Sequence, residues 1–114
     1  MDNVINQRVI IRKKDRGEYI LNGLCDFWGV DMAYIQRPAH HNPRKRNQKY
    51  MAIYMLYNIA DFPLKDIADV MGYAHSSLHT MGERRDEIAD KLSGINGDKD
   101  LINEYNQILK HLQL

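Results

Sequence analysis

The stretch LKDIADVMGYAHSSLHTM, residues 64–81, decides the predicted fold. A helix-turn-helix needs a small residue where its two helices approach, a glycine in the turn, and apolar residues on both sides of it. Ala68 supplies the small residue and Gly72 the turn glycine, and the flanking apolar positions hold Ile67, Met71, Leu78 and Met81. The spacing therefore predicts a helix-turn-helix, although a short helix, a glycine and a long helix also occur in proteins that never contact DNA.

The second helix of this predicted motif starts near His75, Ser76 and Ser77. Side chains of these types can donate hydrogen bonds to phosphates or read the edges of bases in a groove. The free backbone amides at the start of a helix add to its attraction for phosphate. We therefore treat these three residues as candidate DNA contacts, and the alternative is that they only cap the helix.

Helical periodicity continues on both sides of the motif. Apolar stripes with turn and cap signals predict helices over about 18–28, 32–36, 47–59, 64–71, 74–92 and 99–112. The segment 47–59 is apolar on most sides, which is typical of a buried central helix. We predict an all-α, compact domain of five to six helices that contains a helix-turn-helix and spans residues 17–114. Residues 1–16 lack clear periodicity, and we expect a flexible N-terminal arm there.

Composition limits the class of protein. The 114 residues are 44% hydrophobic and 27% charged, which fits one globular domain with its own core. Cys25 is the only cysteine, so no internal disulfide can form. No apolar run approaches the roughly 20 residues of a membrane span, and the start Met1-Asp2-Asn3 does not resemble a signal peptide. We expect a cytoplasmic protein without a membrane segment.

No constellation of residues predicts catalysis. A nucleophile among Ser76 and Ser77, with His75 beside them, lacks both an orienting acid nearby and an elbow motif. A pair of histidines four residues apart, His75 and His79, has no obvious third ligand for zinc. We therefore expect no enzymatic activity, no cofactor and no bound metal.

Charge is divided unevenly along the chain. The first 50 residues hold ten basic and five acidic side chains, whereas the remaining 64 hold six basic and ten acidic ones. Such asymmetry suggests a surface that meets a polyanion, and nucleic acid is the commonest one. The cluster Arg44, Lys45, Arg46 and Lys49 precedes the predicted central helix and supplies candidate phosphate contacts. The alternative is that these basic residues are simply solvated.

Several segments, taken in order, resemble the C-terminal DNA-binding domain of the bacterial replication initiator DnaA. They are Phe27-Trp28-Gly29-Val30, a basic loop, Met51-Ala52-Ile53-Tyr54-Met55-Leu56, Leu64–Gly72 and His75-Ser76-Ser77-Leu78. The resemblance covers roughly residues 18–112 and has no gaps between Met51 and Gly72. It implies an all-helical fold with a helix-turn-helix, in the same superfamily as the Trp repressor.

The resemblance also implies a set of DNA contacts. His75, Ser76 and Ser77 match the family residues that enter the major groove, and Lys65 matches a contact near the start of the first motif helix. The basic residues before the family's central helix reach the minor groove and phosphates, and in this chain that neighbourhood holds Arg44, Lys45, Arg46 and Lys49. The implied function is binding of double-stranded DNA in replication or transcriptional regulation. A protein of a phage or a mobile element is one kind of protein that fits this function.

This sequence departs from the family pattern at three points. The segment directly before His75 is one residue shorter than in the family. Ala74 stands where the family has an aspartate that reads a base, and Asn47 aligns with the family's minor-groove arginine. We therefore expect a different target sequence. The chain also has no Gly-x-x-x-x-Gly-Lys-Ser/Thr stretch, so we expect a stand-alone version of the domain. The alternative function is a protein-interaction module on the same scaffold that binds a replication or transcription protein. A homodimer is a further candidate assembly, because a single helix-turn-helix reads few base pairs.

Overall fold

The computed structural model describes residues 13–37, 42–74, 78–94 and 97–114. Within these ranges all regular structure is helical, with six α-helices and no strands, which confirms the predicted all-α class. The helices are α2 (Lys13–Trp28), α3 (Met32–Gln36), α4 (Pro43–Asn58), α5 (Leu64–Met71), α6 (Leu78–Leu92) and α7 (Lys99–Leu112). None of these described helices is long and apolar enough to cross a membrane.

Side-chain caps fix the starts of three helices. The carboxylate of Asp31 accepts a hydrogen bond from the Tyr34 amide at 2.8 Å and begins α3. The side chain of Asn42 accepts one from the Lys45 amide at 3.1 Å and begins α4. The Asp98 carboxylate accepts from two amides in the first turn of α7. Each cap satisfies backbone donors that have no partner inside the helix.

Three predicted boundaries lie elsewhere. We expected a helix from about residue 74, but Ala74 is not helical and α6 is described from Leu78. We expected the central helix to begin near residue 47, but α4 begins at Pro43, because a proline in the first turn loses no helical hydrogen bond and has a suitable φ. Helix α2 begins at Lys13, so residues 13–16 of the expected arm are helical. Residues 1–12 of that arm lie outside the described part of the chain.

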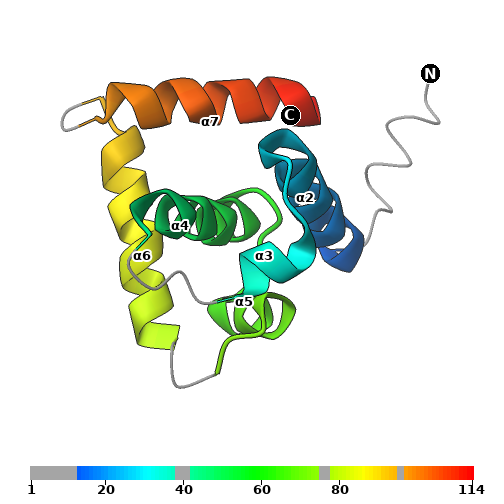
Figure 1. Ribbon diagram of the computed structural model, residues 1–114. Coiled ribbons are helices and arrows are strands. Elements are labelled where there is room, and N and C mark those ends of the chain that lie inside the picture. The colour runs from blue at the N-terminus through cyan, green and yellow to red at the C-terminus, as the bar shows by residue number, and fades with distance from the viewer. Residues whose placement is uncertain (1–12, 38–41, 75–77, 95–96) are drawn as a thin grey trace, which may run out of the picture.

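The core is built around α4, the predicted central helix. Its side chains from Met51 to Leu56 are almost all buried, and every other described helix contributes to the same cluster. Helix α7 lies across one end of the molecule, where it packs against both α2 and α6 (Figure 1). Helix α5 packs against α4 and α6 at the opposite end, and the short α3 contacts α2 and α4. This arrangement places the start of α4 between α3, α7 and the segment after α5.

Candidate nucleic-acid interface

The segment predicted to form the turn of a helix-turn-helix follows α5. Gly72 adopts the left-handed conformation, with φ of 73°, and its amide donates to the Ala68 carbonyl. The next amide, of Tyr73, also donates to the Ala68 carbonyl, at 2.8 Å. These bonds end α5 in the manner that favours glycine, because other residues are strained at positive φ.

The apolar positions of this segment are buried as predicted. Ile67, Ala68 and Met71 of α5 and Met81 of α6 lie in the core, and Leu78 is half-buried against it. The structure thus brings together the predicted core positions of the motif. The predicted base-reading residues His75, Ser76 and Ser77 lie outside the described residues, and Lys65 is exposed in the first turn of α5.

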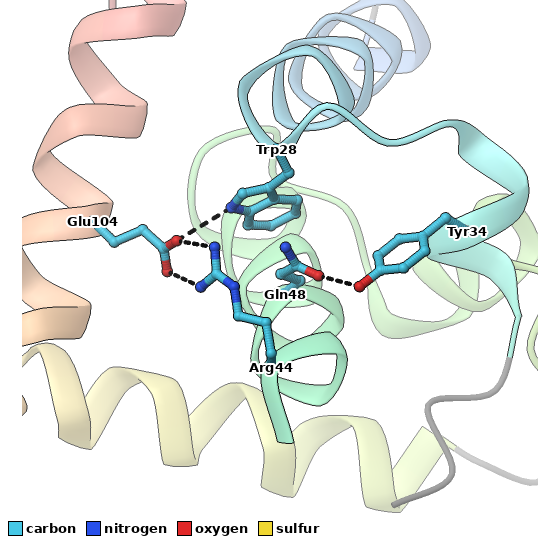
Figure 2. Close-up of polar contacts among 5 residues, drawn as sticks. All are labelled: Trp28, Tyr34, Arg44, Gln48 and Glu104. Atoms are coloured by element: carbon cyan, nitrogen blue, oxygen red, sulfur yellow. Dashed lines mark hydrogen bonds and ion pairs between the residues drawn. The ribbon is translucent and has the colours of Figure 1, made fainter. Parts of the chain in front are cut away.

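The first predicted phosphate contact, Arg44, is held by an acidic side chain of α7. Its two terminal nitrogens lie 3.0 Å and 2.7 Å from the two carboxylate oxygens of Glu104. The indole Nε1 of Trp28 also donates to Glu104, at 3.3 Å. Figure 2 shows this network, in which side chains of α2, α4 and α7 meet. Glu104 and Trp28 were not among the predicted site residues.

The neighbouring basic residues are partly covered. The ammonium of Lys45 lies 4.5 Å from the centre of the Tyr34 ring, which is the geometry of a cation–π contact. The hydroxyl of Tyr34 donates to the buried Gln48 side chain at 2.6 Å (Figure 2). Arg46 is half-buried. The first two turns of α4 therefore carry one exposed and two half-exposed basic side chains.

Lys49 differs from the other predicted phosphate contacts because its side chain is buried, with 4% exposed. Its ammonium donates to the backbone carbonyls of Ile35 and Arg37 at the end of α3. It also lies 5.2 Å from the centre of the Tyr73 ring. Burial, together with the charge of Lys45, lowers the pKa of Lys49 to about 8. In this conformation Lys49 stabilises the end of α3 and is not accessible to phosphate.

A hydrogen bond also connects α3 to the end of α5. The side-chain amide of Gln36 donates to the Val70 carbonyl in the last turn of α5, at 3.1 Å. Together with the Lys49 contacts, it ties α3 to both α4 and α5. The start of α4 and the predicted turn are thus held in one fixed arrangement, although they are more than twenty residues apart in sequence.

The arginines of α6 face the central helix. Arg84 and Arg85 lie 5.4 Å and 4.2 Å from the ring centres of Tyr50 and Tyr57 in α4. They also pair with carboxylates of their own helix, Arg84 with Glu87 at 2.5 Å and Arg85 with Asp86 at 3.0 Å. These two arginines therefore contribute to the packing of α6 on α4.

Comparison of the chain with protein-family models, curated proteins and solved structures finds no match. The arguments about function therefore rest on the residues and on their geometry.

Proposed function

We propose that the protein binds double-stranded DNA with the segment formed by α5, the Gly72 turn and α6. The observation that carries the proposal is the left-handed Gly72 between two helices that both pack on α4, with every predicted core position of the motif buried or half-buried. Such a pair of helices can place the start of the second one in a major groove. The basic start of α4 is fixed to this pair through α3.

In this proposal affinity and base reading come from different residues. Arg44, Lys45, Arg46 and Lys65 neutralise phosphates, which positions the protein on the duplex without reading sequence. His75, Ser76 and Ser77, which come directly before α6 in the sequence, read bases, as the resemblance to the DnaA domain implies. Lys49 has only an indirect role, because its ammonium is buried. The same resemblance favours a task in replication or transcriptional regulation.

The test is fluorescence anisotropy with a labelled mixed-sequence duplex of about 20 base pairs, roughly two helical turns. Neutralising four phosphates predicts that affinity falls about 150-fold when salt rises from about 50 mM to 200 mM. Binding that does not change with salt, or no binding at the lower salt, contradicts the proposal.

Paired variants separate the two kinds of contact. Lys45→Ala with Arg46→Ala should weaken binding to every duplex and reduce the steepness of the salt dependence. Ser76→Ala with Ser77→Ala should leave most of the affinity for mixed DNA and flatten the preference among sequences. Lys91→Ala with Lys110→Ala is the matched control, because it removes the same charge from the last turns of α6 and α7. The control should leave both the affinity and the steepness of its salt dependence nearly unchanged.

One observation favours the second candidate, a module that binds a replication or transcription protein. Two of the predicted phosphate contacts are engaged within the fold, Arg44 by Glu104 and Lys49 by backbone carbonyls. Binding to a protein partner does not require free basic side chains that neutralise phosphates. The anisotropy experiment decides between the two, because only the DNA-binding function predicts a steep loss of affinity with salt on a bare duplex.

A further inference from the structure

The pair formed by Arg44 and Glu104 has the geometry of phosphate recognition. Each terminal nitrogen of Arg44 contacts one carboxylate oxygen of Glu104, at 3.0 Å and 2.7 Å, and an arginine binds a phosphate in the same forked manner. An arginine held in this way cannot grip a phosphate with the same two nitrogens. The side chain of Arg44 is still 56% exposed, so an incoming phosphate can reach it, whereas that of Glu104 is 18% exposed.

Glu104 is held in place independently of Arg44. The indole of Trp28 donates to one of its oxygens at 3.3 Å, and Glu104 lies on α7, which packs against α2 (Figure 2). The indole contact and the packing of α7 on α2 therefore position the carboxylate at the start of α4 without help from Arg44.

We propose that Glu104 determines the affinity of this protein for nucleic-acid phosphate by competing for Arg44. This inference rests on the proposed function and adds a residue to it, since the sequence pattern assigned no residue of α7 to the site. A DNA phosphate must displace the carboxylate before Arg44 can contribute. Removal of the carboxylate's charge frees the guanidinium and strengthens binding.

The experiment is a double-mutant cycle measured by anisotropy on the mixed-sequence duplex at low salt. Glu104→Gln keeps the shape and the acceptor for Trp28 and removes the charge, and we expect about 3- to 10-fold tighter binding. Glu18→Gln, at an exposed position of α2, is the control for the change in net charge and should have little effect. In an Arg44→Ala background, Glu104→Gln should increase the affinity for the duplex by no more than Glu18→Gln does.

Trp28 supplies a second readout because it is the only tryptophan. Displacement of Glu104 from Arg44 alters the charge beside the indole, so DNA should change the emission of the wild type. The change should disappear in Arg44→Ala. Circular dichroism of each variant checks that the fold is retained before the affinities are compared.

The outcomes distinguish this inference from the proposed function. If the wild type binds with the expected salt dependence but Glu104→Gln binds no tighter than Glu18→Gln, the inference is overturned and DNA binding stands. If only Glu104→Gln binds, competition by Glu104 is supported and the wild type is too weak a binder for the proposed function. If neither protein binds, both are overturned. Binding of the wild type without a change in Trp28 emission also overturns the inference.

Discussion

Lys49 is the residue at which burial and charge oppose each other most directly. Its pKa falls from an ordinary 10.5 to about 8, because burial disfavours the charged form and the charge of Lys45 adds to the effect. Between these two pH values the unfolded chain binds more protons at Lys49 than the folded protein does. Stability contributed by this group therefore rises with pH across that window. The stem and the two carbonyl contacts hold the side chain in place throughout.

We predict that Lys49→Met removes this rise. The free energy of unfolding of the wild type, relative to Lys49→Met, should increase by about 1–2 kcal/mol between about pH 7.5 and 9.5. Urea titrations at several pH values measure it. The comparison with the variant is needed because the raised pKa values of Cys25 and Tyr73 have the opposite effect at the upper end of the range. Parallel curves for the two proteins would show that Lys49 keeps its ordinary pKa.

The residues of the candidate site were only partly predictable. Sequence spacing identified Arg44, Lys45 and Lys49 as basic residues at the start of a helix, but their surroundings come from distant parts of the chain. Arg44 meets Glu104 sixty residues later, and Lys49 meets the end of α3. No local sequence pattern predicts such pairs, because the polar residues of α7 follow the same spacing whether or not one of them faces a cation.

Helix elements were predicted well where local signals act alone. Gly72 ends α5 in the left-handed conformation and α6 ends at Leu92, both as the sequence indicated. The start of α4 was missed because Pro43 is a helix breaker in the interior but a favoured residue in the first turn. Only the Asn42 cap distinguishes these two cases.

Two glycines in neighbouring elements should respond to alanine with opposite signs. Gly72→Ala should lower the free energy of unfolding by about 1–2 kcal/mol, because φ is 73° while the nearest atom to an added Cβ is 4.0 Å away. Gly82→Ala lies in the middle of α6, where an added Cβ meets Leu64 at 3.4 Å, an ordinary contact. It should raise stability by about 0.5–1 kcal/mol through helix propensity.

Thermal or urea denaturation of the two variants measures both effects. A lower stability of Gly82→Ala would mean that α5 and α6 pack too tightly to accept the added Cβ. An unchanged stability of Gly72→Ala would mean that residue 72 does not adopt the left-handed conformation. That result would remove the main support for the proposed helix-turn-helix.

At the scale of the molecule, one core unites all the described helices. Leu24 of α2, Ile35 of α3, Ile67 of α5 and Ile108 of α7 are each completely buried in the cluster around α4. Helix α7 closes this core against α2 and α6 (Figure 1). The apolar stripe predicted a helix over 99–112, but not which helices it packs against, because periodicity defines a face and not its partner.

A shared core predicts cooperative unfolding even when a mutation is confined to α7. Ile108→Ala should destabilise the protein by about 2–5 kcal/mol, because the side chain is wholly buried and leaves a cavity. Leu114→Ala, at a position 55% exposed, should change stability by less than about 0.5 kcal/mol. Circular dichroism reports on all helices and Trp28 emission on α2, so the two transitions of Ile108→Ala should coincide. An earlier transition in Trp28 emission would instead mean that α7 detaches from α2 before the rest unfolds, and the contact between Glu104 and Arg44 would then be lost while the remaining helices stay folded.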